Sequence, residues 1–412
     1  MWVWLPRKLE PVVAGVLTPT DLKVEGEEVL SFTYAKSYQT LPNRISLFVK
    51  ELPLQDHPNY PSLPMYGRVP LALHGCIRDC APDAWGRRVI NQRLAGNSDV
   101  ILNELTYLAN SGSNRIGALD FQTSPEKYEH RGGAATLEQL MHAAERIEAG
   151  EALPDDLQAA AEHGTSIGGA MPKALLNDGN RELIAKFSSS TDTRPVIQGE
   201  AAATFLAARV GIQVAHSEIQ TVAGKKVLLL ERFDRLPSGE RKQMLSALTI
   251  LGQNETGARY SSYPDLADEI RKGPWEQVGA TLRELFTRLV FNICIGNTDD
   301  HLRNHAAFWD GEFLRLTPAY DLTPQRRSGG TANQAIGITR DNERHSQLRL
   351  CRKASSSFLL TPQEADEITN DVVSKIKTNW KDSCDHAQLS TVEAEGFMGR
   401  EILNPYIFYD EG

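Results

Sequence analysis

The chain has 412 residues, of which 41% are hydrophobic and 24% charged, a composition that is ordinary for a globular protein of two or three domains. Its net charge of −9 argues against a protein that coats nucleic acid by bulk electrostatic attraction. No apolar run approaches the ~20 residues of a membrane span, and the N-terminus lacks the pattern of a secretion signal. The five scattered cysteines fit free thiols in a reducing compartment. These features predict a cytoplasmic protein.

The N-terminal part of the chain is expected to be rich in β-structure. Strand-like runs separated by Gly, Pro and Asp clusters are expected at residues 12–18, 29–35 and 45–54. A helical pattern at residues 82–95 interrupts them. Residues 134–163 are also helical in pattern and polar enough to form a connector.

Strands return in the middle of the chain, where they are expected at residues 173–177, 182–188 and 225–235. A helix pattern at 199–211 separates the last two strands and ends at Gly211, in the manner of a C-cap. From Gln243 onward the pattern is mostly helical. It is broken once by a predicted hairpin at 305–318, with Asp310-Gly311 as the turn signal.

The order of these elements predicts an α+β fold with three regions. Residues 1–155 form a β-rich N-terminal region with a helical connector, residues 156–238 form a small α+β nucleotide-binding lobe, and residues 239–412 form a larger, all-helical C-terminal lobe.

A dense polar segment, "GNTDDHLRN", follows the apolar run "LRELFTRLVFNI". With Asp310 and Gly311 as turn residues, Asn304 is expected near Thr317, and Asp321 follows four residues later. Adjacent strands are about 4.8 Å apart, so Asn304 and Asp321 are expected at the open end of the hairpin, together with Asp299. Such oxygen ligands suit Mg²⁺, and one acid would remain to orient or deprotonate a hydroxyl. A polar surface loop is the alternative.

A glycine-bearing loop, "GTSIGGAMPKALL", runs into the strand expected at 173–177. Gly168 and Gly169 would let backbone N–H groups approach phosphate oxygens, and the hydroxyls of Thr165 and Ser166 lie where a phosphate could be accepted. The loop matches neither G-x-x-x-x-G-K-[ST] nor G-x-G-x-x-G, and an ordinary flexible turn is the alternative.

The strands that follow carry further candidates for nucleotide binding. Lys186 interrupts an apolar strand, as a kinase lysine does when it reaches phosphates, and Glu200 on the next helix could pair with it. Glu231 and Phe233 lie where a linker beside adenine would begin. The alternatives are a lysine that reaches water at a strand edge and a surface cluster of ion pairs. The order of all these parts is that of a phosphotransferase.

The segments "GTSIGGAMPKALL", "VLLLERFDR", "GNTDDHLRN" and "RLTPAYDLTP" closely resemble the signature segments of the HipA family of bacterial serine/threonine kinase toxins. "RISLFVKELPL", "IRDCAPDAWGRRVI" and "LANSGSNRIGALDF" resemble that family's N-terminal domain. The resemblance covers nearly the whole chain. It implies a two-lobed, protein-kinase-like fold that binds ATP and Mg²⁺ and phosphorylates a protein hydroxyl. Family members whose targets are known modify aminoacyl-tRNA synthetases. The resemblance therefore implies a substrate of that class and, as partner, a HipB-like, DNA-binding antitoxin that would make most of the DNA contacts.

The resemblance also implies a role for each matching residue. Asp299 would be the catalytic base, Asn304 and Asp321 the metal ligands, and His301 a support of the loop that also contacts the nucleotide. The remaining cofactor-binding residues would be Ser166, Ile167, Gly168, Gly169, Lys186, Glu200, Glu231 and Phe233. Ser166 matches the family's site of autophosphorylation, with Thr165 as the competing acceptor, and modification there would switch the kinase off.

The sequence departs from the family pattern at Met171, where Gln is common, and at Arg303, where Lys is usual. Arginine keeps the charge but changes its geometry, so the rate or substrate choice is expected to differ. Two other functions fit the motifs less well. One is a small-molecule or lipid phosphotransferase, and the other is a kinase-shaped co-repressor that works with a DNA-binding antitoxin.

Overall fold

The computed structural model describes residues 1–62, 70–132, 135–165, 171–179, 181–189, 192–327 and 329–409. The chain divides into two compact units. The first unit contains Met1–Thr191, Gln220–Leu245 and Phe308–Glu312, and the second contains Asp192–Ile219, Ser246–Ala307 and Phe313–Gly412. The domain boundaries expected at 155 and 238 stay predictions.

The described strands form four sheets, with the strand orders β2-β1-β5, β3-β4, β6-β7-β9-β8 and β10-β11-β12. The strands are β1 (Trp2–Val3), β2 (Val12–Val13), β3 (Gly15–Val24), β4 (Glu27–Tyr34), β5 (Leu119–Asp120), β6 (Lys173–Asn177), β7 (Glu182–Phe187), β8 (Ser217–Val222), β9 (Lys225–Glu231), β10 (Gln243–Ser246), β11 (Ala306–Trp309) and β12 (Leu314–Leu316). The expected strands at 173–177, 182–188 and 225–235 are confirmed as β6, β7 and β9. β10 was missed, because its four residues fall in a stretch with a helical pattern.

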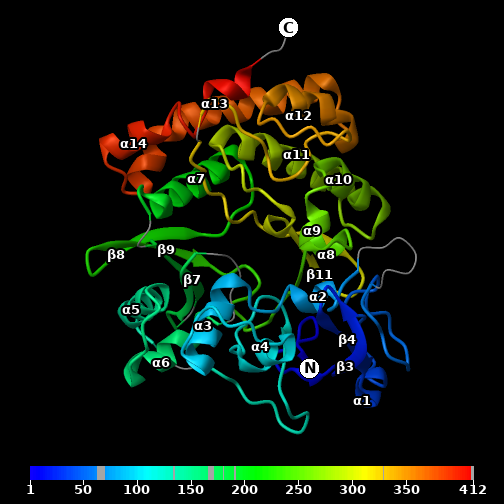
Figure 1. The fold of residues 1–412 in the computed structure, drawn as a ribbon. Helices are drawn as coiled ribbons and strands as arrows, with labels where there is room; N and C mark the ends of the chain where they lie inside the picture. The colour runs from blue at the N-terminus through cyan, green and yellow to red at the C-terminus, as the bar shows by residue number, and fades with distance from the viewer. Residues whose placement is uncertain are drawn as a thin grey trace. The chain divides into compact units, whose positions relative to one another are not determined.

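Helices occur in both units (Figure 1). The α-helices are α1 (Lys36–Gln39), α2 (Gly75–Arg78), α3 (Ala84–Ala95), α4 (Glu104–Asn110), α5 (Leu137–Glu148), α6 (Asp155–Glu162), α7 (Val196–Val210), α8 (Ala247–Ile250), α9 (Glu255–Ala258), α10 (Tyr263–Lys272), α11 (Val278–Ile295), α12 (Leu348–Ala354), α13 (Pro362–His386) and α14 (Thr391–Phe397). The 3-10 helices are η1 (Leu302–Asn304), η2 (Ser355–Phe358) and η3 (Pro405–Phe408). No helix in these described ranges is both long and apolar enough to cross a membrane.

In the first unit, one face of the β6-β7-β9 sheet is covered by helices. β6 pairs antiparallel with β7, and β7 pairs antiparallel with β9, so every second side chain points to the same face. Ala174, Leu183 and Ala185 lie on this face and pack in one buried cluster with residues of α3, α5 and α6. The segment at 134–163 is helical as predicted, but it forms a core layer over the sheet, because Leu140 and Ile147 of α5 are buried in that cluster.

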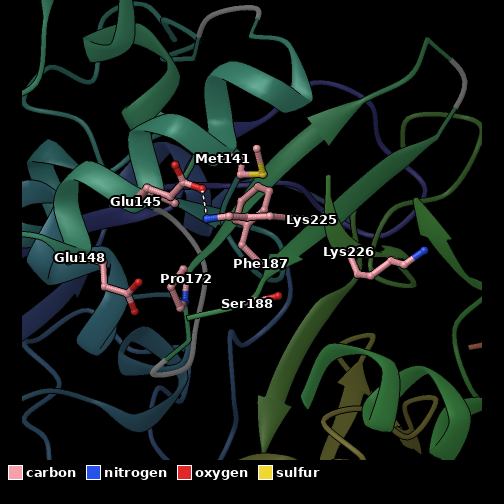
Figure 2. Close-up of a pocket in the computed structure, with 9 residues that line it drawn as sticks. Met141, Glu145, Glu148, Pro172, Phe187, Ser188, Lys225 and Lys226 are labelled. Carbon is pink, nitrogen blue, oxygen red and sulfur yellow. Dashed lines mark hydrogen bonds and ion pairs between the residues drawn. The ribbon is translucent and has the colours of Figure 1, made fainter. Parts of the chain in front are cut away.

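Figure 2 shows how α5 is fixed to the edge of this layer. Lys225 at the start of β9 donates from Nζ to Glu145 Oε1 at 2.7 Å, and Met141 and Phe187 lie beside this ion pair in the wall of a shallow pocket. The Ser189 hydroxyl donates to Glu148 on the same helix. Of the described residues that line this pocket, none was singled out by the sequence, and the pocket serves packing.

The strand expected at residues 45–54 is wrong. The segment forms turns with a single bridge between Phe48 and Leu52. Leu47, Phe48 and Leu52 are buried, whereas Val49 and Leu54 are exposed, and a tyrosine hydroxyl takes the place of a neighbouring strand. Leu47 N donates to the Tyr34 hydroxyl at 3.1 Å, and that hydroxyl donates to Leu52 O at 2.7 Å. The apolar run therefore did not by itself determine backbone conformation.

In the second unit, long helices form the core. α7 and α11 both contact α13, and Figure 1 shows α7 and α13 running side by side. α7 ends before Gly211, which has a φ of 101° and donates its N–H to Ala207 O and Ala208 O in the C-cap, as the sequence predicted. Toward its C-terminal end, α11 is buried on all sides, which is why its sequence shows an almost unbroken apolar run.

Candidate functional site

The polar segment begins where the buried helix α11 stops. Gly296 follows the helix with a φ of 70°, a conformation that favours glycine. A Cβ at this position would also lie 2.5 Å from Glu401 O, so the close approach of the backbone excludes any larger residue. The chain therefore makes a closely packed turn at the point where the sequence changes from apolar to polar.

Asn297 shows why polar groups are buried beyond this turn. It is 1% exposed, and its Nδ2 atom donates to Asn292 Oδ1 at 3.1 Å and, with longer geometry, to Asp321 O at 3.4 Å. Its carbonyl accepts from Gln334 Nε2 at 3.2 Å. Because buried polar groups need partners, this network fixes the loop to the segment that carries Asp321.

The two neighbouring aspartates have opposite surroundings. Asp300 is 1% exposed and accepts a short hydrogen bond from the Tyr263 hydroxyl, while His305 Nε2 lies 2.9 Å from its Oδ1 in a close contact that is not aligned as a hydrogen bond. Asp299 is exposed. Only the Asp299 carboxylate is therefore open to a substrate, a distinction that the sequence could make only by spacing.

Asp299, His301 and Asp321 lie close enough to affect one another electrostatically. Burial raises the pKa of the Asp299 carboxyl above its usual value, the nearby charges of Asp321 and Asp300 raise this pKa further, and His301 opposes them. Asn304 is 8% exposed, and its Nδ2 atom donates to Asp299 O at 3.2 Å. The structure therefore brings the predicted catalytic residues together in one place.

Asp321 has a backbone conformation that is uncommon for a residue with a side chain. Its φ is 59°, in the left-handed region, where strain is often found at functional positions. Its carbonyl accepts from Thr323 N at 3.0 Å. Its neighbours Tyr320 and Leu322 line a cavity of about 10 Å³ together with Asn304, which is about the size needed for one water molecule.

The hairpin that delivers these residues has a different register from the one predicted. Thr317 N donates to Ala306 O at 3.0 Å, so Ala306 lies opposite Thr317 in place of Asn304. β11 ends at Trp309 and β12 begins at Leu314, which leaves four connecting residues in place of two. The predicted residues still come together, because Asn304 Nδ2 donates to Asp299 O and Asp321 lies close enough to Asp299 to raise its pKa.

These residues fit a magnesium ion better than a metal held by protein alone. Asn304 and Asp321 offer an amide and a carboxylate oxygen, and Mg²⁺ usually combines one or two such ligands with waters and phosphate oxygens. In the described ranges there is no group of three or more His, Cys, Asp or Glu side chains that could hold a metal. The like charges of Asp299 and Asp321 would also be offset by a cation.

The first unit contains the predicted phosphate-binding lysine and a second lysine that the sequence did not indicate. Lys186 on β7 is paired directly with Lys173 on β6. Both are almost fully buried, at 6% and 5% exposed, and both point away from the helix-covered face, since Ala174 and Ala185 occupy that face. The register of β6 against β7 places Lys173 beside Lys186, and the sequence alone did not provide this register.

The segment after β9 combines an aromatic contact with a buried ion-pair network. Phe233 packs edge-to-face on Phe308, with ring centroids 6.0 Å apart. Asp234 accepts from Arg232 Nη2 at 2.7 Å and from Arg235 Nη1 at 3.0 Å, and these guanidinium groups hold the pKa of the Asp234 carboxyl well below its usual range. The alternative of a surface cluster of ion pairs is therefore wrong for this segment.

The other predicted residues have separate placements. Glu231 ends β9 in the first unit, while Glu200 lies on α7 in the second unit and is 1% exposed, so its pairing with Lys186 stays a prediction. Ser166, Ile167, Gly168 and Gly169 lie outside the described residues.

Thr165 and His301 are both described. The Thr165 hydroxyl is buried, donates to Glu162 O at 2.7 Å and accepts from Gly112 N at 2.9 Å. His301 Nδ1 is buried without a hydrogen-bond partner among the described residues, so this ring nitrogen is available to a ligand.

Two family models match this chain. The HipA-like C-terminal domain matches residues 165–380, and the HipA N-terminal domain matches residues 10–122. This chain belongs to the HipA family. The membership confirms the resemblance that the signature segments indicated.

Sequence identity to an individual protein is low and covers only part of the chain. The chain is 26% identical over 150 residues to the putative kinase Y4mE of Sinorhizobium fredii (strain NBRC 101917 / NGR234), a match that covers 34% of this chain and 33% of that protein. The match therefore spans about a third of the relative's length.

Solved structures extend the comparison to the whole chain. The HipA of the Shewanella oneidensis MR-1 toxin–antitoxin system, solved with HipB and its operator DNA, has a TM-score of 0.60 at 16% identity, covering 96% of this chain and 97% of that chain. The Helicobacter pylori proinflammatory kinase CtkA has a TM-score of 0.40 at 15% identity, covering 57% and 90%. The HipA match confirms the predicted two-lobed, kinase-like α+β fold.

Two positions depart from the HipA pattern. Arg303, where lysine is usual, forms an ion pair with Glu255, and its carbonyl accepts from the Tyr320 hydroxyl. The Arg303 side chain therefore ties the predicted catalytic loop to α9, while the backbone at this position holds the residue before Asp321. Met171 is partly buried at the end of the glycine-bearing segment.

Proposed function

We propose that this chain is an ATP- and Mg²⁺-dependent serine/threonine protein kinase that acts as the toxin of a toxin–antitoxin pair. The observation that carries the proposal is the convergence of Asp299, Asn304 and Asp321 in the second unit, with Asp299 exposed beside the charge of Asp321. Membership of the HipA family supports the same function.

Each residue has a role that follows from its surroundings. The exposed Asp299 orients the substrate hydroxyl and accepts its proton, and its raised pKa makes the carboxylate a better acceptor. Asn304 and Asp321 hold magnesium, and His301 offers its buried ring nitrogen to the nucleotide. Bound Mg·ATP supplies the phosphoryl group and neutralises charge on its phosphates.

The first unit contributes the nucleotide contacts. Lys186 and its neighbour Lys173 are buried cations on one face of the sheet, and phosphate oxygens are the natural partners of such a pair. Glu231 and Phe233 follow at the end of β9, where they would meet the adenine. Glu200 is assigned to the support of Lys186, as in other kinases.

Autophosphorylation at Ser166 is part of the proposal. The competing acceptor Thr165 has its hydroxyl engaged in two hydrogen bonds and is fully buried, which favours Ser166. A phosphate in the glycine loop would add negative charge where the nucleotide phosphates bind, and this repulsion would switch the enzyme off.

The proposed partners are a protein substrate in translation and an antitoxin. An aminoacyl-tRNA synthetase is the substrate class that the family implies. The Shewanella HipA structure contains HipB and operator DNA, which supports a HipB-like antitoxin for this chain. The net charge of −9 fits a protein that leaves most DNA contacts to that partner.

The decisive experiment is incubation of the purified chain with labelled ATP, Mg²⁺ and cell lysate, followed by phosphosite mapping. We expect Asp321→Ala to abolish phosphoryl transfer, while Asp341→Ala, an exposed aspartate of the same unit, leaves it unchanged. Intact-mass measurement should show one added phosphate that is lost in Ser166→Ala. Unchanged transfer by Asp321→Ala would remove the metal assignment.

A cellular test separates catalysis from binding. We expect Asp299→Gln to relieve the growth arrest caused by overexpression, because glutamine cannot accept the substrate proton. Growth arrest that persists in this variant would show that toxicity does not come from kinase activity.

A further inference from the structure

The first unit contains a cavity of about 290 Å³ that none of the proposed catalytic residues lines. This volume is close to the lower end of the range for ligand-binding pockets. One wall is the end of β6 with Leu175, Leu176 and Asn177, and the other walls come from residues near His130 and from the segment 235–241. The cavity therefore opens along the edge of the sheet.

β6 is the edge strand of the β6-β7-β9-β8 sheet. Phe187 N donates to Pro172 O at 3.0 Å, which sets the alternation of the ladder, so the backbone groups of Lys173, Leu175 and Asn177 point outward. The first part of this edge is covered by the chain itself. Trp85 Nε1 donates to Lys173 O at 2.8 Å, and Leu175 N donates to the carbonyl of residue 163 at 3.0 Å.

The remainder of the edge is open. Leu175 O and Asn177 N have no hydrogen-bond partner among the described residues, and both residues line the cavity. An acceptor and a donor at this spacing are the groups through which an extended chain adds to a sheet. Asn177 is exposed, so a peptide can reach this point from solvent.

The charge around the cavity indicates what kind of peptide fits. Arg241 donates from Nη1 to Ser113 O at 2.9 Å and stacks its guanidinium 3.5 Å from the Trp4 ring centroid. It forms no ion pair with a carboxylate in the described part of the chain. Arg235 and Arg232 already share Asp234. Arg241 is half-buried and lies near the charges of Asp120 and Asp234 without a direct ion pair to either in the described part of the chain, so an anionic ligand would supply a carboxylate in direct contact.

The acidic residues of the lining contact other groups and form no ion pair with Arg241 among the described residues. Glu182 accepts from Asn114 Nδ2 at 2.7 Å and from Asn177 Nδ2 at 2.9 Å, and Glu162 pairs with Arg93 at 3.2 Å. Both carboxylates therefore have partners of their own, and neither pairs with Arg241. We propose that this cavity binds an extended peptide segment that adds to the edge of β6 and directs an acidic side chain toward Arg241.

The proposal can be tested with defined peptides and the full-length protein, in the absence of ATP. The probe is an acetylated, fluorescein-labelled peptide, Thr-Val-Asp-Val-Asp-Val-Thr, with its binding followed by fluorescence anisotropy. A second peptide replaces both Asp residues by Asn, and a third replaces alternate Val residues by N-methylvaline, which removes backbone donors. We expect each change to weaken binding about tenfold or more, the effect of roughly 1.4 kcal/mol.

Two protein variants test the strand edge. Asn177→Pro removes the outward N–H group, and Asn177→Ala is the matched control, because both variants lose the same side-chain hydrogen bonds while only proline loses the donor. We expect at least a tenfold difference in peptide affinity between them. In the unchanged protein, the peptide should slow hydrogen exchange of the Asn177 amide.

A third variant tests the charge. Arg241→Gln should bring the affinities for the acidic and the amide peptide together. Because Arg241 also bonds to Ser113 and packs on Trp4, its replacement affects packing as well as charge, and the comparison of the two peptides on the unchanged protein is the primary measurement. Equal binding of both peptides, equal binding by Asn177→Pro and Asn177→Ala, or no binding at millimolar concentration would each overturn the proposal.

Discussion

The neighbouring aspartates of the catalytic loop should respond to the same substitution in opposite ways. Asp300→Asn removes a carboxylate that is 1% exposed and in contact with Tyr263 and His305. A hydrogen bond to a charged group contributes about 1.5–3 kcal/mol, and Asp300 accepts one from the Tyr263 hydroxyl. We therefore expect a loss of about 2 kcal/mol in the free energy of unfolding.

Asp299→Asn should leave stability nearly unchanged and abolish phosphoryl transfer. Asp299 is exposed, and surface substitutions usually change stability by less than about 0.5 kcal/mol. Its raised pKa means that the folded protein disfavours the ionised carboxyl, so a neutral side chain costs nothing electrostatically. The loss of activity follows because asparagine cannot accept the proton of the substrate hydroxyl.

The assay combines urea unfolding, followed by tryptophan fluorescence, with ADP formation by the same preparations. A double-mutant cycle with Tyr263→Phe gives the coupling directly, since the tyrosine substitution should cost less once Asp300 is neutral. If Asp299→Asn were as destabilising as Asp300→Asn, or if Asp300→Asn left both stability and activity intact, the division of roles between the two residues would be refuted.

Three further predictions concern other buried charges. His74 is 1% exposed, and burial lowers its pKa to about 4. The unfolded chain therefore binds a proton between about pH 6.5 and 4 that the folded chain does not, so the free energy of unfolding should fall by about 3 kcal/mol as the pH decreases through this range. A His74→Gln variant that showed the same pH dependence in urea unfolding would contradict this. Asp234→Asn should destabilise the first unit by about 3 kcal/mol or more, because it leaves two buried guanidinium groups without their shared carboxylate. Asp366→Asn, at an ion pair whose aspartate side chain is 53% exposed, should cost less than about 1 kcal/mol. Equal denaturation midpoints for the two variants would disprove this contrast. Lys173→Met should weaken Mg·ATP binding about tenfold, as expected for the loss of a charge-assisted phosphate contact, and Lys225→Met should not; an unchanged dissociation constant in calorimetric titration of Lys173→Met would exclude Lys173 from the nucleotide site.

Local sequence predicted secondary structure correctly wherever one residue had a strong preference for the local backbone conformation. The helix at 199–211 ended at Gly211 as expected, because a glycine that can adopt positive φ stops a helix without help from distant residues. It was a poor guide at residues 45–54, where only part of the apolar run is buried and the backbone bonds to Tyr34. The exposure of each side chain and the partner of each backbone group depend on what lies across the fold.

The hairpin shows the same limit at the site. The turn signal at Asp310-Gly311 located the hairpin, but the register was displaced by two residues. Asn304 and Asp321 still lie near Asp299, because their positions depend on η1 and on the segment after β12, both of which lie outside the strand ladder.

By itself, the sequence determined the kinds of chemical group at the site and their order along the chain, since both are covalent facts. Tertiary structure decided which of Asp299 and Asp300 is exposed, that Lys173 lies beside Lys186, and that Arg241 is half-buried without a direct ion pair to a carboxylate among the described residues. Exposure, pKa and pairing depend on what surrounds a side chain after folding, and those neighbours come from segments that are remote in the sequence.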